Sequence, residues 1–254
     1  MSFITAVRTD IGTRKKTNED SVLVIQAQTD RGPAMLVSVC DGMGGLAKGE
    51  VASSAMVHAL DNWFKTELPR LISQGFRADV LWESWKQLIN DTNERISDYG
   101  AGLHVDLGTT TAAVLVYDGH YYIMNVGDSR VYLLSDTIYQ LTKDQTFVQQ
   151  ELDAGRMTFE ESLTDPRRSV LTQCIGASRV IEPEFETGEV GKGMVLMACS
   201  DGFRHVVAPS EFYQALTPGK LRDRTQIEQI LDDLIRLNIS RGEDDNITAA
   251  VAVL

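Results

Sequence analysis

The chain has 254 residues, 43% of them hydrophobic and 24% charged, and its formal net charge is −12 at pH 7. This composition is typical of a folded soluble protein with one substantial core. The negative charge would repel nucleic acid and anionic membranes, and no apolar run approaches the roughly 18 residues of a membrane span. Charges also occur too early in the N-terminus for a secretory signal. We therefore expect a single cytoplasmic domain over residues 1–254, without a nucleic-acid or membrane partner.

Short runs rich in Val, Ile, Leu, Tyr and Ala predict strands, and apolar residues repeated every three or four positions predict amphipathic helices. In chain order, the expected elements are strands at 21–26 and 35–40, helices over 52–64 and 81–96, strands at 109–117, 121–126, 130–134 and 194–199, a helix over 227–235 and a strand at 247–254. The helices come in adjacent pairs and do not alternate with strands. This order favours an antiparallel β core flanked by helices over a doubly wound sheet.

Three further local features follow from the pattern. Only Gly127, Asp128 and Ser129 separate two predicted strands, so we expect an antiparallel hairpin there. Residues 143–179 are irregular and polar, and we expect them to form a helical and looped surface insertion. The three cysteines are widely spaced, two of them in apolar runs, and are expected to be reduced and buried.

Acidic residues recur where predicted strands begin or end. They are Glu19 and Asp20 before the first strand, Asp41 and Asp201 after two apolar strands, Asp128 in the expected hairpin, and Asp244 and Asp245 before the last strand. Clustered carboxylates stay ionised only if cations neutralise them. The four histidines show no zinc-like spacing and are expected to be solvated or packed, so an all-oxygen site for Mg²⁺ or Mn²⁺ is predicted.

Two such ions can activate a water molecule and neutralise the charge that develops on a phosphate ester. The chain has neither a GxxxxGK[ST] loop nor a Cys-x5-Arg loop, which argues against nucleotide hydrolysis and cysteine-based phosphatase chemistry. The segment DGMGG, residues 41–45, has glycines that would let the main chain approach a metal, with the Gly42 carbonyl as a ligand. The pattern therefore favours metal-dependent phosphate chemistry.

Eight motifs then occur in a characteristic order. They are NEDS at Asn18, DGMGG at Asp41, GTT at Gly108, GDSRVY at Gly127, LTKDQ at Leu141, RRSVLTQCIG at Arg167, SDGF at Ser200 and DDNIT at Asp244. With these motifs the chain resembles the type 2C (PPM) metal-dependent serine/threonine protein phosphatases, in their compact bacterial form. The resemblance implies an α+β fold of four layers (αββα), in which helices flank a sandwich of two antiparallel sheets with the metal centre at one end.

The resemblance also implies roles for individual residues. Asp41 would bridge two core ions, with the Gly42 carbonyl on one and Asp201 and Asp245 on the other. Glu19 and Asp20 would hold metal-bound waters. Asp128, with Asp201, would bind a third, weaker ion, and residues 143–179 would form a flap. The implied activity is hydrolysis of phosphoserine and phosphothreonine by a metal-activated water, in a monomer that reverses a serine/threonine kinase.

The chain departs from the family pattern at three places. Lys15 stands where the family has a phosphate-binding arginine; either Arg14 or Lys15 could bind phosphate, and we favour Arg14 because only arginine offers a bidentate fork. A solvated basic run without this role is the alternative. Met43 replaces the histidine of eukaryotic members and removes that general acid. The flap motifs read DQT at Asp144 and DP at Asp165, where histidine is common in relatives.

A rival hypothesis is a catalytically silent module that uses the same fold to bind a phosphoprotein or regulate a kinase. The full set of carboxylates weighs against it, because a scaffold has no use for mutually repulsive groups. Metal-dependent release of phosphate from an ester would separate the two hypotheses.

Overall fold

The computed structural model describes residues 3–44 and 48–254, and twelve strands form its centre in this part of the chain. The strands are β1 (Ile4–Asp10), β2 (Ser21–Thr29), β3 (Gly32–Cys40), β4 (Gly42–Gly44), β5 (Leu107–Thr109), β6 (Thr111–Tyr117), β7 (His120–Val126), β8 (Arg130–Leu134), β9 (Ile138–Gln140), β10 (Glu184–Glu189), β11 (Val195–Cys199) and β12 (Ile247–Val253). The first sheet has the order β1-β12-β11-β8-β9, the second has the order β10-β7-β6-β3-β2, and β4 pairs with β5. All neighbouring strands are antiparallel.

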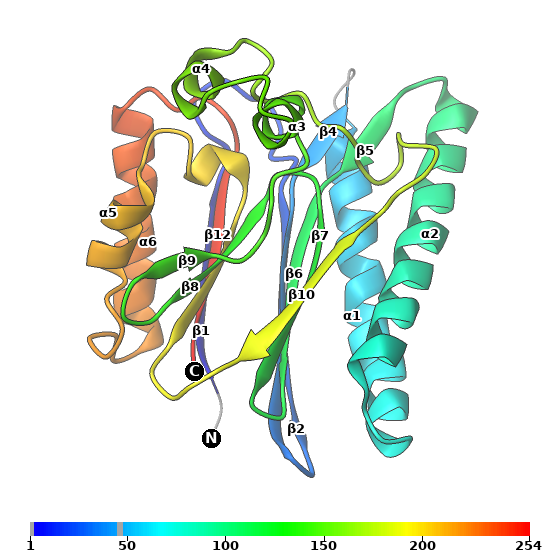
Figure 1. Ribbon diagram of the computed structural model, residues 1–254, viewed down its shortest axis with the longest axis vertical. Helices are drawn as coiled ribbons and strands as arrows, with labels where there is room; N and C mark the ends of the chain where they lie inside the picture. Colours follow the sequence, from blue (N-terminus) through cyan, green and yellow to red (C-terminus); the bar gives the residue numbers. More distant parts are fainter. Residues whose placement is uncertain (1–2, 45–47) are drawn as a thin grey trace.

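Helices cover both outer faces of this sandwich (Figure 1). The helices α1 (Gly49–Ser73) and α2 (Ala78–Leu103) pack on the second sheet, and α5 (Pro209–Ala215) and α6 (Arg224–Ser240) pack on the first. Two short helices, α3 (Phe147–Asp153) and α4 (Phe159–Thr164), lie within residues 143–179 and over one end of the sandwich. The four-layer arrangement of helix, sheet, sheet and helix confirms the predicted fold class.

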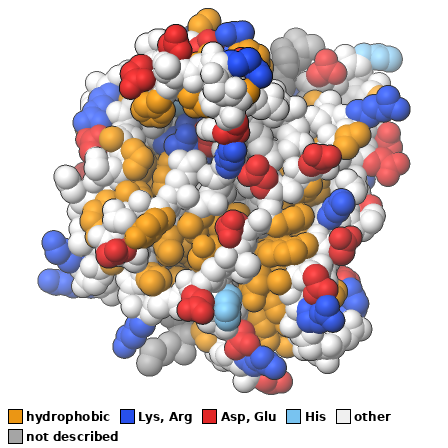
Figure 2. Space-filling model, in the orientation of Figure 1, with side chains coloured by type: hydrophobic (Ala, Val, Ile, Leu, Met, Phe, Trp, Pro, Cys, Tyr) orange, Lys and Arg blue, Asp and Glu red, His pale blue; other side chains and the backbone are white. Residues whose placement is uncertain are grey.

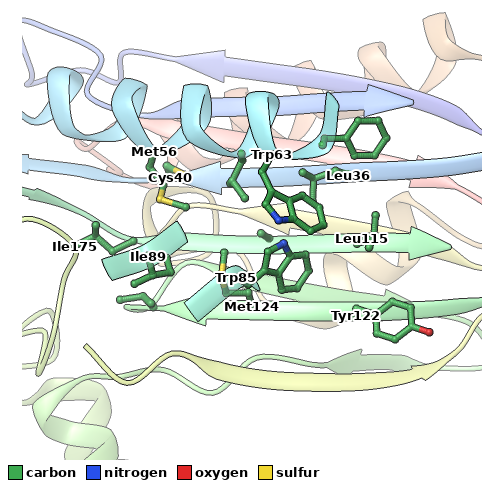
Figure 3. Close-up of a cluster of buried hydrophobic side chains, with 14 of the residues drawn as sticks. Leu36, Cys40, Met56, Trp63, Trp85, Ile89, Leu115, Tyr122, Met124 and Ile175 are labelled. Atoms are coloured by element: carbon green, nitrogen blue, oxygen red, sulfur yellow. The ribbon is translucent and has the colours of Figure 1, made fainter. Parts of the chain in front are cut away.

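Three layers of apolar side chains fill the spaces between these elements. On β3, Leu36 faces the helices while Val37 faces the other sheet, as the alternation of a strand requires. Trp63 of α1 and Trp85 of α2 pack with their ring centroids 5.5 Å apart, in the same apolar layer as Leu115 of β6 (Figure 3). Because both faces of the central strands are covered, these strands are almost continuously apolar.

One side of the sandwich is more open. Figure 2 shows apolar side chains gathered in the hollow between the edge strands β9 and β10. Ile123, Leu141 and Phe185 line the cavity there, together with polar residues such as Glu184. No helix in the described ranges is long and apolar enough to span a membrane.

The predicted hairpin at Gly127–Ser129 is wrong. β7 belongs to the second sheet and β8 to the first, so the two strands do not pair with each other, and the connection crosses from one sheet to the other. Gly127 has φ +99°, and an added Cβ would lie 2.5 Å from a methyl group of Thr110. The glycine therefore allows the chain to cross from one sheet to the other, and this short loop is not a hairpin turn.

Other elements were predicted with incomplete bounds or not at all. The predicted strand 109–117 is divided at Thr110 into β5 and β6. The strands β1, β4, β9 and β10 and the helix α5 were not expected. The cysteines Cys40, Cys174 and Cys199 are free and buried, as predicted.

Candidate metal centre

The strand registers bring the predicted acidic residues to one end of the sandwich. Ser21 at the start of β2 pairs with Cys40 at the end of β3, so the adjacent Asp20 and Asp41 lie side by side. In the other sheet, Cys199 at the end of β11 pairs with β8 and with β12 near their starts. The segments that adjoin these strand ends carry Asp201, Asp128 and Asp245.

These carboxylates strongly affect one another. Burial raises the pKa of Asp41 well above its ordinary value, and the charges of the other four aspartates raise it further. Burial and neighbouring negative charge also raise the pKa of Asp20 to about 7. The Ser200 hydroxyl donates to Oδ2 of Asp20 at 2.9 Å, while Oδ1 is buried without a hydrogen-bond partner in the described residues.

His205, for which no role at the site was predicted, supports Asp201. Nε2 of His205 lies 3.2 Å from Oδ2 of Asp201, and Nδ1 lies 3.2 Å from Oε2 of Glu243. Burial opposes a charged imidazole, but these two carboxylates raise the pKa of His205 to about 10. Burial alone would also raise the pKa of Asp201, yet the His205 hydrogen bond and positive charge lower it. The spacing of four residues in SDGFRH was the available signal for this pair.

An arginine supports Asp128 in a similar way. Nη2 of Arg204 donates to the Asp128 carbonyl oxygen at 2.8 Å and to its Oδ2 at 3.2 Å. Burial and the charge of Asp201 nevertheless raise the pKa of Asp128 to about 7, which the Arg204 charge only partly opposes. Arg204 was not predicted as a site residue, because an arginine after SDGF carries no spacing signal of its own.

The two candidate phosphate-binding residues have different surroundings. Arg14 is 80% exposed in its side chain and pairs with Asp244 at 3.1 Å. Lys15 is 38% exposed, and its Nζ lies 2.8 Å from Oδ1 of Asp245 and 3.8 Å from Oε2 of Glu19. Burial opposes the charge of Lys15, but the hydrogen bond to Asp245 raises its pKa. Lys15 therefore contacts the acidic cluster directly, whereas Arg14 contacts its outer rim.

A cavity of about 490 Å³ adjoins both residues. Its lining consists of Arg14, Lys15, Lys16, Thr17, Glu19, Gly44, Asp244 and Asp245. Basic and acidic groups thus face one space at the predicted metal end of the sandwich. A phosphate dianion that entered it would meet the lysine ammonium beside the carboxylates.

Glu19 and Gly42 have structural contacts at the start of α1. Oε1 of Glu19 accepts the Gly49 N–H at 3.0 Å, and the Glu19 carbonyl oxygen accepts the Gly42 N–H at 3.2 Å. A Cβ on Gly42 would lie 2.3 Å from the Gly49 carbonyl oxygen. The close approach that requires glycine at position 42 is therefore to Gly49 and Glu19. Gly45, the last residue of the DGMGG motif, lies outside the described residues.

The GTT motif fixes the main chain of Asp41. The Thr110 N–H donates to the Asp41 carbonyl oxygen, and the Thr110 hydroxyl accepts the Asp41 N–H, both at 2.9 Å. Thr109 donates a further hydrogen bond to the same carbonyl oxygen at 3.0 Å. Two threonines thus position the backbone from which the Asp41 carboxylate extends.

The donor set suits a hard divalent cation, because all the predicted donors are oxygen atoms. Oδ1 of Asp20 and Oδ1 of Asp201 are both buried without a hydrogen-bond partner in the described residues. Within the same residues, no three His, Cys, Asp or Glu side chains already lie in an arrangement that could hold an ion. The carboxylates would therefore have to turn toward a bound cation, whose charge would remove their mutual repulsion.

The fold and the acidic cluster together define a class of protein. The type 2C protein phosphatases are expected to have this arrangement, in which an antiparallel sandwich lies between helical layers and carries interacting aspartates at one end. The model of the family Protein phosphatase 2C matches residues 12–250, and the chain belongs to this family. The serine/threonine phosphatase stp of Listeria innocua is 32% identical over 246 residues, which are 95% of this chain and 92% of the relative.

Solved structures agree with this assignment. The serine/threonine phosphatase of S. agalactiae has a TM-score of 0.86 and 28% identity, with 100% of both chains covered. The catalytic domain of the phosphatase PstP, solved in complex with two manganese ions, has a TM-score of 0.78 and 29% identity, with 99% of both chains covered. The metal centre predicted from the sequence is thus consistent with a structural relative that contains manganese.

Proposed function

We propose that the acidic cluster is the catalytic centre of a divalent-metal-dependent enzyme that hydrolyses phosphoserine and phosphothreonine in proteins. As a member of the protein phosphatase 2C family, the protein is an enzyme that acts on phosphoproteins. The observation that best supports the proposed centre is the meeting of Asp20, Asp41, Asp128, Asp201 and Asp245 from separate strand ends. Lys15, Arg204 and His205 offset this negative charge only in part, because the pKa values of Asp20, Asp41 and Asp128 stay raised, and such repulsion is hard to reconcile with a purely structural role.

We assign the ligands by the chemistry of their donors. Asp41, Asp201 and Asp245 would hold the two core ions with the Gly42 carbonyl, Glu19 and Asp20 would orient water around them, and Asp128 would hold a third ion with Asp201. When bound, Mn²⁺ or Mg²⁺ would supply charge neutralisation and an activated water for attack on phosphorus.

The remaining steps belong to the side chains of the chain itself. Lys15 would bind the phosphate dianion as a point charge, because its ammonium borders the cavity beside Asp245. Thr109 and Thr110 would hold Asp41 in position through its main chain. Met43 cannot donate a proton, so we expect the leaving hydroxyl group to take its proton from water.

Three further proposals concern the cellular setting. The phosphatase would act in the cytoplasm as a monomer and would reverse the action of a serine/threonine kinase. The relatives' names support serine/threonine phosphatase activity, and the kinase itself stays a prediction.

The test is phosphate release from a phosphothreonine peptide, measured with Mn²⁺ and with chelator. We expect Mn²⁺-dependent turnover in the wild type and a loss of about 100-fold or more in Asp41→Asn and in Asp201→Asn. Asp98→Asn, an exposed change on α2, is the matched control and should retain full activity. Full activity in Asp41→Asn would refute the assignment, and no metal-dependent rate in the wild type would favour the silent binding module.

A further inference from the structure

The flap comprises residues 143–179, and its first residues contact the loop that carries Asp128. The Gly127 N–H donates to Oε1 of Gln145 at 2.8 Å, and the Gln145 N–H donates to the Gly127 carbonyl oxygen at 2.9 Å. Gln145 is buried, with 8% of its surface exposed. The side chain and the main chain of one residue therefore hold the glycine that precedes Asp128.

Gln145 also connects the beginning of the flap to its later part. Its carbonyl oxygen accepts both the Thr172 N–H, at 2.8 Å, and the Thr172 hydroxyl, at 2.9 Å. The neighbouring Thr146 forms a β-bridge with Leu171. A single residue thus joins the Asp128 loop to both sides of the flap base.

A buried ion-pair chain makes a second connection between the same segments. Arg204 pairs with Asp128 at 3.2 Å and with Asp144 at 3.4 Å, and all three side chains are at most 11% exposed. Nε and Nη2 of Arg130 donate to the two carboxylate oxygens of Asp144 at 2.8 and 2.7 Å. Asp144 immediately precedes Gln145, so this ion-pair chain fixes the position of the residue that holds Gly127.

We propose that Gln145 is a positioning residue for Asp128, through which the flap base sets the affinity of the metal centre. The proposal rests on the proposed function, because it takes Asp128 as a metal ligand. Burial and the charge of Asp201 both raise the pKa of Asp128, so the buried carboxylate has to be held close to Asp201 against their repulsion. The reciprocal Gly127–Gln145 hydrogen bonds restrain the loop against that repulsion, and Thr172 transmits the restraint to the flap.

The chain offers a closely matched pair of substitutions. Gln145→Met keeps the length and most of the volume of the side chain but removes the acceptor for the Gly127 N–H. Gln149→Met makes the same chemical change on α3, where the glutamine amide donates only to the exposed Asp153. A merely structural role of Gln145 would lower the melting temperature without changing the response to metal.

The experiment combines calorimetric titration of Mn²⁺ with hydrogen exchange of the Gly127, Gln145 and Thr172 amides, with and without Mn²⁺. In the wild type and in Gln149→Met, we expect Mn²⁺ to slow exchange at these amides at least threefold. In Gln145→Met, the slowing at Thr172 should be lost. The weakest Mn²⁺ binding event should weaken about threefold to tenfold, the range expected for one buried hydrogen bond.

Two results would overturn the proposal: unchanged exchange at the three amides when Mn²⁺ binds the wild type, or the same Mn²⁺ affinity in Gln145→Met as in Gln149→Met. If Gln145→Met fails to fold, the wild-type exchange measurement decides alone. Absence of phosphatase activity in the wild type would refute the proposed function, while exchange and calorimetry would still decide the role of Gln145.

Discussion

Arg14 and Lys15 are neighbours in the chain, but of the two only Lys15 places its ammonium group in contact with Asp245 of the acidic cluster. The sequence favoured Arg14 on the chemistry of its fork, because the direction of a side chain in a loop has no local signal. The loop geometry gives Lys15 the contact with Asp245 and places Arg14 against Asp244 at the rim. The residue types thus indicated which side chain is chemically better suited to bind phosphate, but they did not indicate which side chain lies beside the acidic cluster.

Lys15→Met is accordingly expected to raise KM for a phosphothreonine peptide about tenfold or more, because it removes the ammonium that borders the cavity beside Asp245. Arg14→Met, the matched change one residue earlier, should alter KM by less than about twofold. Steady-state kinetics at saturating Mn²⁺ would measure both. A larger effect of the Arg14 change would return the phosphate-binding role to Arg14.

The pKa of Asp20 leads to a pH dependence of stability without metal. Its pKa is about 7 in the folded chain, above the ordinary value of 3.8, so the folded state binds more protons than the unfolded state between these values. The stability contributed by protonated Asp20 is therefore complete below about pH 4 and is lost as the pH rises through 7.

Asp20→Asn should remove this loss. In chelator, the melting temperature of the variant should fall less than that of the wild type between pH 5 and pH 8, by about 3 °C or more. Calorimetry of both proteins and of Asp98→Asn would measure the difference. Equal pH dependence in the wild type and Asp20→Asn would show that the Asp20 carboxyl titrates normally.

At the scale of elements, the start of α1 depends on a side chain from another segment. Its N-cap residue Lys48 makes no side-chain capping bond, and Oε1 of Glu19 accepts the Gly49 N–H instead. A carboxylate at this end of a helix also interacts favourably with the helix dipole. Glu19 thus stabilises α1 in addition to the water-orienting role proposed for it.

We expect Glu19→Ala to lower the free energy of unfolding in chelator by about 1–2 kcal/mol, since a buried N–H loses its acceptor. Glu19→Gln keeps an oxygen at the same place and should cost less than half as much. Urea unfolding would measure both, with the exposed Glu83→Ala as control. A cost for Glu19→Ala no greater than that for Glu83→Ala would contradict the capping role.

Most of the strands that were correctly predicted from the sequence are buried on both faces and are therefore strongly apolar. The central strands β3, β6 and β11 are covered on both faces and were found from their apolar runs. The edge strands β1 and β10 pair on one side only and carry charged residues, so their pattern was too weak to identify. The prediction of a β7–β8 hairpin was wrong because loop length does not reveal that two strands belong to different sheets.

At the scale of the whole molecule, the sandwich acts as a frame that brings distant carboxylates together. The sequence showed which strand ends carry aspartates, and the registers of two separate sheets then determine that those ends meet. The four-residue spacing of Asp201 and His205 was a signal for that pair, whereas the support from Arg204 could not be predicted, because it depends on how the segment after β11 packs against the Asp128 loop and the flap. The sequence thus predicts the acidic residues that meet at this end, and their role as metal ligands stays a prediction.

The most direct test of the metal centre is a crystal structure of the protein grown with Mn²⁺, with anomalous diffraction to locate the metal. We predict manganese density in contact with Asp41 and bounded by Asp201 and Asp245, with the carboxylates turned toward it. Clear manganese density elsewhere, or none between these three aspartates at saturating Mn²⁺, would contradict the account.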